Sequence, residues 1–503
     1  VVGDEVVLGE GSVIKPNIKI WPSKIIDPFT TVSSNLKWGI RWYKSLFEPW
    51  GITGLVNIEI TPELATRIGL AIGSWLEADS EVVIGRDTFV SSRMIKRAII
   101  SGLIATGVRV YNIPVCPLPV LTHYVKTRGL DAGIVVTTPI LDPQSVRIKI
   151  FDSSGMEINN TVRKKINDLF FKEEYRRVLA DRLGTIMYPT GYVEAYLQDL
   201  LKHVNVSEVS SSKLKAVLDC GNAAGSIVAP ALLEALGVEA IVINSRAETN
   251  LRPRPIPVMV KNINIVSQIV RAVGADVGFV LDADADRVVI IDENGRPLEG
   301  DVAVAFLAIE ILKRKGPGKV VVPISASYII DSVVERACGK IVRAGLGSRS
   351  VVETILREGA VFGGDDRGAF VYPDFHPGFD GLMTMAKVVE IIAEEKKGLS
   401  EIVKNIPEPY MVKKRIAFPL MYRGLLMRKL HEELREREID TIDGIKIVEG
   451  DGWVFIHPVA NEPIIEIVAE APSIETAEIL VKQLMGLIED IRKELKISSI
   501  VLE

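Results

Sequence analysis

The sequence predicts an α/β protein in which three αβα domains are followed by a small α+β domain and preceded by a short left-handed hexapeptide β-helix. Three observations carry this prediction. The chain has 503 residues, which is too long for one hydrophobic core. Apolar runs of strand length alternate with amphipathic helical stretches, a pattern typical of mostly parallel sheets covered on both faces. At the start of the chain, by contrast, aliphatic residues recur every six positions.

The six-residue repeat indicates a parallel β-helix at the start of the chain. Each flat face of such a helix buries one aliphatic residue per hexad, and three hexads close one coil. Six hexads make about two coils, and coils of this kind need neighbours that cover their ends. We therefore expect further coils upstream of this chain; the alternative is a short irregular β arm. The repeating residues are Val2, Leu8, Ile14, Ile20, Ile26 and Val32.

The strand–helix rhythm returns three times and then changes to a smaller α+β pattern. A helix start is marked by Thr61-Pro62-Glu63, where an N-cap residue is followed by Pro and an acid. The last unit ends in a strand at 463–470 and a long amphipathic helix at 473–495. The expected parts are a β-helix fragment at 1–38, αβα domains at 45–190, 191–295 and 296–405, and a C-terminal α+β domain at 406–503.

The composition is that of an ordinary soluble globular protein, with 48% hydrophobic and 25% charged residues. A net charge of −5 with interspersed signs gives no reason to expect nucleic acid or membrane binding. Cys116, Cys220 and Cys338 lie far apart in apolar surroundings, so we expect three buried thiols in a reducing compartment, the cytoplasm. No apolar stretch is long enough to span a membrane.

A cluster of acids at 282–286 is the strongest candidate site. Asp282, Asp284 and Asp286 alternate between two apolar runs, 277–281 and 288–291, that we expect to be buried strands. Alternate residues point the same way, so the three carboxylates converge. Oxygen ligands of full negative charge suit Mg²⁺ or Mn²⁺. An EF-hand is a weaker reading, because Arg287 stands where that loop needs Gly; a solvated acidic turn without a ligand is the other alternative.

Several further stretches carry a family resemblance. The acidic loop, read as Asp-x-Asp-x-Asp-Arg, is accompanied by four other groups of residues. They are Gly51-Ile52-Thr53-Gly54; Gly85-Arg86-Asp87 with Ser91-Ser92; Gly363-Gly364-Asp365-Asp366-Arg367-Gly368; and Asp443-Gly444, Trp453 and Glu462-Pro463. Over residues 45 to 495 the chain resembles the α-D-phosphohexomutases, the phosphomannomutase and phosphoglucomutase enzymes. The leading hexads resemble the end of a sugar-1-phosphate nucleotidyltransferase, an order similar to mannose-1-phosphate guanylyltransferase–phosphomannomutase fusions.

The resemblance implies a mechanism and a set of site residues. In the family a phosphoserine of the first domain exchanges its phosphoryl group with a hexose phosphate, and a metal neutralises the transferring group. The implied metal ligands are Asp282, Asp284 and Asp286, with Lys149 and Arg287 retained nearby. The implied sugar-phosphate contacts are Asp365, Arg367, His457 and Asn461. The implied partners are a hexose phosphate, an upstream sugar nucleotidyltransferase domain and further copies of the chain, bound through the β-helix.

The sequence departs from the family at the nucleophile. The family loop Thr-Ala-Ser-His-Asn-Pro corresponds to Thr137-Thr138-Pro139-Ile140-Leu141-Asp142, so the Ser position is Pro139, which has no hydroxyl. Without an oxygen nucleophile the covalent mechanism cannot run as the family runs it. Thr137, Thr138, Ser145 and Asp142 are the neighbouring substitutes, but a shift of one or two residues misplaces the reacting atom.

The other substrate loops also depart from the family. Thr53 replaces Arg, Asp365 replaces Glu, Arg367 replaces Ser, and the loop from His457 to Pro463 lacks the fixed guanidinium that would hold a phosphate. Three hypotheses follow. The favoured one is a mutase-fold domain that keeps the metal but is impaired or inactive. The second is a working phosphomannomutase or phosphoglucomutase with an unrecognised nucleophile. The third is a structural, oligomerising module of a sugar nucleotidyltransferase.

Overall fold

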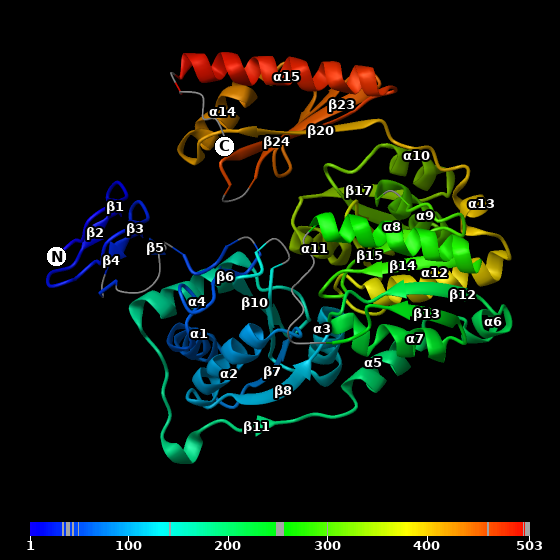
Figure 1. Ribbon diagram of the computed structural model, residues 1–503. Helices are drawn as coiled ribbons and strands as arrows, with labels where there is room; N and C mark the ends of the chain where they lie inside the picture. The colour runs from blue at the N-terminus through cyan, green and yellow to red at the C-terminus, as the bar shows by residue number, and fades with distance from the viewer. Residues whose placement is uncertain are drawn as a thin grey trace. The chain divides into compact units, whose positions relative to one another are not determined.

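A computed structural model describes residues 1–32, 35–36, 41–42, 45–48, 50–139, 142–247, 256–298, 300–459, 462–495 and 497. Figure 1 follows the chain from its N-terminal strands to the long C-terminal helix. The contacts divide the chain into two compact units. The first contains residues 1–295 and 381–390, and the second contains residues 296–380 and 391–503. We describe each unit separately.

The chain begins with short parallel strands, β1 (Val7–Leu8), β2 (Val13–Ile14), β3 (Ile25–Ile26), β4 (Thr31–Val32) and β5 (Arg41–Trp42). Two of the pairings join residues 18 positions apart, since Val7 lies opposite Ile25 and Val13 lies opposite Thr31, whereas β3 pairs with β5 at an offset of 16, with Ile25 opposite Arg41. The offset of 18 is three of the predicted six-residue repeats. A small core of Ile20, Ile26, Val32 and Leu36 is buried among these strands, while the hexapeptide β-helix itself stays a prediction.

The first αβα domain is built on a six-stranded sheet of order β11-β8-β7-β9-β10-β6. Strand β10 is antiparallel to both of its neighbours, and the other pairs are parallel. The strands are β6 (Ile52–Leu55), β7 (Glu81–Arg86), β8 (Arg109–Val115), β9 (Ala132–Thr137), β10 (Ser145–Asp152) and β11 (Ile186–Met187). The helices are α1 (Pro62–Trp75), α2 (Val90–Ile104), α3 (Leu118–Arg128), α4 (Asn160–Lys172) and a 3₁₀ turn at Ala180–Arg182.

One face of this sheet forms an aliphatic core of the first unit. It is contributed by alternate residues of the strands, such as Ile52, Val136 and Ile148, together with α1, α2 and α4. Helix α3 packs against β7 and β9. Because side chains alternate along a strand, the residues between these core positions point to the opposite face. That second face carries the polar groups of the candidate site.

The second domain of this unit has a four-stranded sheet of order β13-β12-β14-β15, in which β15 alone is antiparallel. Its strands are β12 (Lys215–Asp219), β13 (Glu239–Ile243), β14 (Val277–Leu281) and β15 (Val288–Ile291). Its helices are α5 (Tyr192–Leu201), α6 (Val206–Ser211), α7 (Ala229–Ala235), α8 (Ile256–Val273) and a 3₁₀ turn at Ala224–Ile227. The observed bounds of β14 and β15 are those that the sequence predicts for the strands beside the acidic loop.

The second unit starts with a sheet of order β17-β16-β18-β19. Its elements are α9 (Gly300–Lys315), β16 (Lys319–Pro323), α10 (Ile329–Arg336), β17 (Lys340–Ala344), α11 (Ser348–Glu358), β18 (Phe362–Asp365), β19 (Ala369–Val371) and α13 (Leu399–Val403). Helix α12 (Gly381–Glu395) belongs to the first unit up to Glu390 and to the second unit from Ile391. The glycine pair Gly363-Gly364 predicts a Gly-rich turn in this unit, and that prediction is wrong. Both glycines lie inside β18, and Gly363 packs so closely that an added Cβ would meet Ile355 at 2.5 Å.

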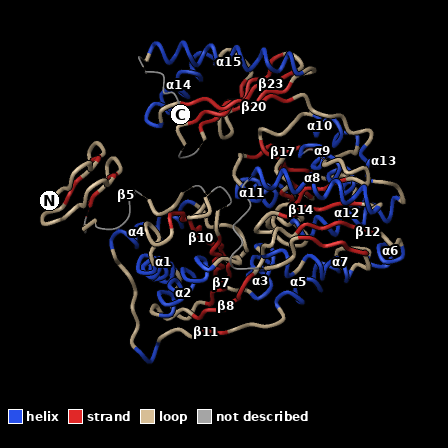
Figure 2. The backbone as a smooth tube through the Cα atoms, in the orientation of Figure 1, coloured by secondary structure: helices blue, strands red, loops and turns tan. Residues whose placement is uncertain are grey.

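A five-stranded antiparallel sheet of order β20-β24-β23-β22-β21 forms the C-terminal domain. Helices α14 and α15 cover one face of it, and α15 runs along the sheet in Figures 1 and 2. The elements are β20 (Met411–Ala417), a 3₁₀ turn at Leu420–Tyr422, α14 (Arg423–Leu434), β21 (Ile439–Asp440), β22 (Ile445–Glu449), β23 (Gly452–Pro458), β24 (Ile464–Glu470) and α15 (Ile474–Glu494). The Ser473 hydroxyl caps α15 by accepting the Thr476 N–H.

A buried polar cluster joins this sheet to the rest of the second unit. The Glu470 carboxylate accepts hydrogen bonds from Ser327 Oγ at 2.5 Å and from Trp453 Nε1 at 2.7 Å. The Lys446 ammonium lies 3.8 Å from the centroid of the Trp453 ring and 4.3 Å from that of Tyr328. Burial lowers the pKa of Lys446 to about 7, whereas the two ring faces favour its charged form.

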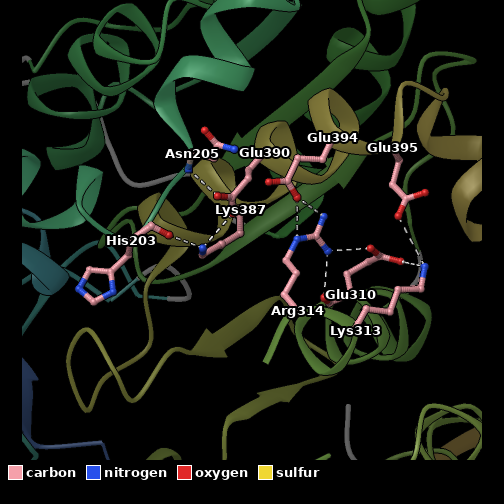
Figure 3. Close-up of polar contacts among 9 residues, drawn as sticks. All are labelled: His203, Asn205, Glu310, Lys313, Arg314, Lys387, Glu390, Glu394 and Glu395. Atoms are coloured by element: carbon pink, nitrogen blue, oxygen red, sulfur yellow. Dashed lines mark hydrogen bonds and ion pairs between the residues drawn. The ribbon is translucent and has the colours of Figure 1, made fainter. Parts of the chain in front are cut away.

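Two separate networks involve side chains from the C-terminal part of α12 (Figure 3). In the first unit, Lys387 donates to the His203 carbonyl, and the Glu390 carboxylate accepts from the Asn205 N–H at 2.6 Å. In the second unit, Arg314 donates to Glu394 at 2.8 Å and to Glu310 at 2.8 Å. Each network satisfies carboxylates that would be costly to bury alone.

The three cysteines differ in their exposure. Cys116 and Cys220 are buried as expected, but Cys338 is exposed. The expectation for Cys338 is wrong, because the residue follows the end of α10 with a left-handed φ of 58° in a turn. His123 and His376 are buried beside Asp199 and Asp380.

In the part of the chain that the structure describes, no helix is both long and apolar enough to cross a membrane.

The contact between α1 and α2 depends on two glycines. An added Cβ at Gly102 would lie 2.2 Å from the Thr66 carbonyl oxygen, and one at Gly69 would lie 2.3 Å from that of Ile99. We expect G102A to separate the two helices and to destabilise the first domain by roughly 1–3 kcal/mol. Hydrogen–deuterium exchange of the α1 and α2 amides measures this effect as faster exchange.

The matched control is G486A. Gly486 lies on the exposed face of α15, with nothing within 4 Å of an added Cβ. Removing a glycine from an exposed helix is expected to stabilise it by up to about 1 kcal/mol. Unchanged exchange of α1 and α2 in G102A would show that the two helices are not held at the distance described.

Candidate active site

The acidic loop lies at the turn of the β14–β15 hairpin. The Asp282 N–H donates to the Arg287 carbonyl at 3.2 Å, and its carboxylate accepts the Arg287 N–H at 3.3 Å. Ala285 is fully buried and adopts a left-handed φ of 56°, which is uncommon for a residue with a Cβ. This turn holds Asp282, Asp284 and Asp286 on one short segment, with Asp286 only 8% exposed.

The electrostatics of these acids are those of carboxylates gathered out of water. Burial and the Asp286 carboxylate raise the pKa of Asp282 well above its usual range, and Arg287 opposes this shift. Burial also raises the pKa of Asp284, with Lys149 acting against it. Like charges at short range disfavour the simultaneous ionisation of these carboxyl groups. The loop therefore needs additional positive charge nearby to keep all of them ionised.

The first domain supplies one cation to the acidic loop. Lys149 Nζ on β10 lies 3.4 Å from Asp284 Oδ2. Burial lowers the pKa of Lys149, but Asp284 and Asp286 outweigh that effect and raise it overall. Lys149 is thus a charged ammonium within reach of the Asp loop. The structure brings together the predicted residues Lys149, Asp282, Asp284 and Asp286 in one unit.

The loop that holds the nucleophile in the family follows β9. The Thr138 N–H donates to Asp87 Oδ2 at 2.6 Å, and Thr138 Oγ1 lies 3.3 Å from Ser92 Oγ. Burial raises the pKa of Asp87 to about 6, although hydrogen bonds from Phe89, Ser92 and Thr138 act against the shift. Pro139 is buried and its ring offers no hydroxyl, while 140 and 141 lie outside the described residues.

The hydroxyl-bearing residues nearest to Pro139 are buried. Thr137 is 4% exposed, Thr138 is 5% exposed and Ser145 is 3% exposed. Ser145 Oγ donates to the Asp142 carboxylate. Each of these hydroxyls belongs to a residue other than the one at the nucleophile position, and such a shift along the chain misplaces a reacting oxygen. The carboxylate of Asp142 is the exposed oxygen group among the substitutes that the sequence suggests.

The predicted sugar loop belongs to the second unit. Asp365 is buried, and its Oδ1 accepts the N–H groups of Arg367 at 3.0 Å and of Ala369 at 3.1 Å. This carboxylate therefore shapes its own turn. The Arg367 side chain is 52% exposed, so it is the member of this loop that presents charge to solvent.

In the same unit, the C-terminal sheet places the predicted His457 in a row of charged residues. Arg415, Glu466 and His457 face one another across β20, β24 and β23. Glu466 lies 3.2 Å from His457 Nε2 and 3.0 Å from Arg415 Nε. The His457 hydrogen bond and Arg415 lower the pKa of Glu466 to about 2. The predicted contact Asn461 lies outside the described residues.

Sequence reasoning did not single out Asp87, Ser92 or Arg147 as members of this site. Asp87 and Ser92 belong to motifs that resemble the family, but the sequence does not show which residues they contact. Arg147 alternates with Lys149 along β10, and that spacing was the available signal. Side chains two residues apart on a strand share a face.

The donor set fits a hard cation such as Mg²⁺. Three carboxylates share one turn, and the neighbouring charges of Asp284 and Asp286 contribute to the raised pKa of Asp282. Among the described residues, no three or more His, Cys, Asp or Glu side chains form a ready-made metal cage. Asp284 is engaged by Lys149 instead. Metal binding by these residues therefore remains a prediction.

Sheets of this order, with an acidic hairpin closing the second domain, define a phosphohexomutase fold. Family models named phosphoglucomutase/phosphomannomutase, alpha/beta/alpha domains I, II and III, match residues 44–177, 194–295 and 299–410. A phosphoglucomutase/phosphomannomutase of Thermococcus kodakarensis is 34% identical over 454 residues, which are 89% of this chain and 99% of the relative. The chain belongs to the phosphoglucomutase/phosphomannomutase family, within the phosphohexomutase superfamily.

Solved structures agree with this fold. A phosphoglucomutase/phosphomannomutase family protein of Burkholderia thailandensis aligns with a TM-score of 0.78 at 22% identity, covering 91% of this chain and 99% of that one. An N-acetylphosphoglucosamine mutase of Aspergillus fumigatus, solved in complex with GlcNAc-6P and magnesium, aligns with a TM-score of 0.53 at 13% identity, covering 88% and 96%.

A testable consequence concerns Asp301, a buried acid at the start of α9. Burial and the neighbouring Asp366 raise the pKa of Asp301 from 3.8 to about 7. Between these values the folded protein binds this proton more tightly than the unfolded chain, so stability falls as pH rises. We expect D301N to gain stability relative to the unmodified protein at pH 8 but not at pH 4, by on the order of 3–4 kcal/mol.

Urea unfolding at the two pH values measures this difference. D451N, which changes an exposed acid of the β22–β23 hairpin, is the control and should give equal effects at both pH values. A D301N effect that is the same at pH 4 and pH 8 would contradict the assigned titration.

Proposed function

We propose that this chain is a phosphohexomutase-family protein of sugar-phosphate metabolism that binds Mg²⁺ and a hexose phosphate but is impaired or inactive as a mutase. The observation that carries the proposal is Pro139 at the nucleophile position, since its buried ring has no hydroxyl and the nearest hydroxyls belong to the buried residues Thr137, Thr138 and Ser145. Phosphoryl transfer through a covalent intermediate needs an oxygen nucleophile within reach of the substrate.

Support for metal binding comes from the acidic hairpin and from the family. Asp282, Asp284 and Asp286 would hold the ion, which supplies charge neutralisation of a phosphoryl group when it is bound. Lys149 lies close to Asp284 and would add a second positive charge beside the ion. The magnesium in the Aspergillus complex is consistent with this choice of ion.

Two alternatives have specific support. Asp142 has an exposed carboxylate beside Pro139, which favours a working mutase that forms an acyl phosphate. The strand pairing at a spacing of 18 residues near the N-terminus favours a hexapeptide β-helix that assembles copies of the chain or continues an upstream sugar nucleotidyltransferase. The sugar is left open, because relatives and solved structures of this family carry different substrate names.

Mutase turnover tests the central claim. The assay uses mannose 1-phosphate and glucose 1-phosphate with Mg²⁺ and a hexose bisphosphate. We expect the unmodified protein to turn over at least roughly 10³-fold more slowly than a relative with the nucleophilic Ser, because the nucleophile is missing. P139S should take up a phosphoryl group from the bisphosphate, detected by mass spectrometry of the intact protein.

The control variant in this assay is D142N. Turnover of the unmodified protein at the rate of an active relative, abolished in D142N, would overturn the inactive reading and identify the acyl phosphate route. Full turnover that survives in D142N would overturn the inactive reading and direct the search to the buried threonines.

Magnesium binding is tested separately by calorimetric titration. We expect D284N and D282N to weaken Mg²⁺ binding about tenfold or more, since each removes a charged oxygen ligand. D168N, on the exposed face of α4, removes an acid from the same unit and should bind Mg²⁺ like the unmodified protein. Equal affinity in all four proteins would exclude the acidic hairpin as the metal site.

A further inference from the structure

The second face of the first sheet carries a row of polar residues across three adjacent strands. Thr53 on β6 and Thr137 on β9 both lie directly opposite Arg147 on β10. Residues directly opposite on antiparallel strands point to the same face, with Cβ atoms about 5 Å apart. Lys149 is two residues further along β10 and shares that face.

Donor groups in this row are left without acceptors. Arg147 Nε is buried and has no hydrogen-bond partner, and Thr53 Oγ1 is likewise buried and unpartnered. Lys149 uses one of its three donors, in a contact of 3.4 Å with Asp284. A buried donor without an acceptor costs free energy, so such groups in a folded protein call for an explanation.

The Arg147 side chain is supported on its stem. Gly51 precedes β6 with a φ of +119°, and an added Cβ there would lie 3.6 Å from Arg147 Cγ. The loop before β6 therefore passes over the stem of Arg147. Arg147 Nε is also buried, and a group that is already partly enclosed loses less freedom when it binds a ligand than a fully exposed one.

The charges around the row restrict what it binds. Arg147 and Lys149 provide two positive charges, and Arg147 counts among the groups that oppose the raised pKa of Asp284. A planar guanidinium fork, an ammonium and a hydroxyl together present donors from several directions. A tetrahedral dianion has enough oxygens to accept from all of them.

We infer that Arg147, with Lys149 and Thr53, forms a binding subsite for the phosphate group of a phosphate monoester in front of the Asp282–Asp286 loop. The inference rests on the proposed function, since it specifies how this site holds a phosphate that Pro139 cannot carry covalently. Arg147 also supplies the guanidinium that position 53 lacks. Thr53 stands where the family has Arg, and Arg147 faces it from the next strand.

A competing role for Arg147 is that of a simple counter-ion to the Asp loop. The two roles predict different responses to Mg²⁺. If Arg147 is only a counter-ion, bound Mg²⁺ replaces it. Removal of Arg147 would then leave phosphate binding unchanged and would make the acidic loop bind Mg²⁺ more tightly. A phosphate ligand works together with the metal, because three carboxylates repel a dianion until a cation neutralises them.

Calorimetric titration with glucose 1-phosphate, inorganic phosphate and glucose, with and without Mg²⁺, tests the subsite. We expect R147Q to weaken binding of glucose 1-phosphate in Mg²⁺ by roughly 10- to 100-fold. R147K, which keeps the charge but loses the fork, should weaken it about tenfold. T53V should weaken it by roughly two- to tenfold. Glucose, which has no phosphate, should not bind through this subsite.

The control is K164Q, which removes an exposed positive charge from α4 in the same unit and should bind like the unmodified protein. Equal thermal unfolding of R147K and the unmodified protein confirms that a loss of affinity is not a loss of fold. Sugar-phosphate binding by R147Q within twofold of the unmodified protein would overturn the Arg147 subsite and leave the proposed function standing. Binding of inorganic phosphate through Arg147, without binding of any sugar phosphate, would overturn the proposed function and leave the subsite.

Discussion

The first unit of this protein is organised around the repulsion among three carboxylates on one turn. Asp282, Asp284 and Asp286 are kept together by the β14–β15 hairpin and by the left-handed backbone of the buried Ala285. Like charges at this spacing are stable only beside compensating positive charge. Lys149 on the first sheet provides part of it. The polar face of that sheet, where Arg147 and Lys149 alternate, is therefore electrostatically dependent on a hairpin of the next domain.

The same constraint separates the nucleophile position from the charged groups. Pro139 is buried and has no hydroxyl, and no charged partner depends on it. The acids and their cations are different, because removing one partner leaves the other buried and unpaired. Loss of either Lys149 or Asp284 is therefore costly to the fold itself.

Much of the fold was predictable from sequence, because period and turn chemistry are local signals. The strands on both sides of the acidic loop were expected at their observed residues, and Thr61 marked the start of α1 as an N-cap. Gly363 and Gly364 were misassigned to a turn, because the close packing that places glycine in β18 involves Ile355, a neighbour that composition does not reveal. The prediction that Cys338 is buried was wrong for a related reason, since its exposure depends on where helix α10 ends.

The site was predictable in its residue types and less so in its partners. The acids and Lys149 could be named from motifs, whereas the inward rotation of Asp365 and the Arg415–Glu466–His457 row depend on register across strands. The pairing of Thr53 with Arg147 is of the same kind. These residues lie 94 positions apart in the chain (147 − 53), and no local pattern connects them.

The buried cluster around Trp453 gives the second unit its own optical signal. The indole is fully buried, its N–H is bound to Glu470, and the Lys446 ammonium lies over its ring. A fixed charge next to an indole alters the energy of its excited state, and water entering the cluster removes that influence. Trp21 and Trp50 are already partly in contact with solvent, at 47% and 43% exposure. Trp453 therefore adds to the intrinsic fluorescence of this protein a component that depends on the integrity of its C-terminal sheet.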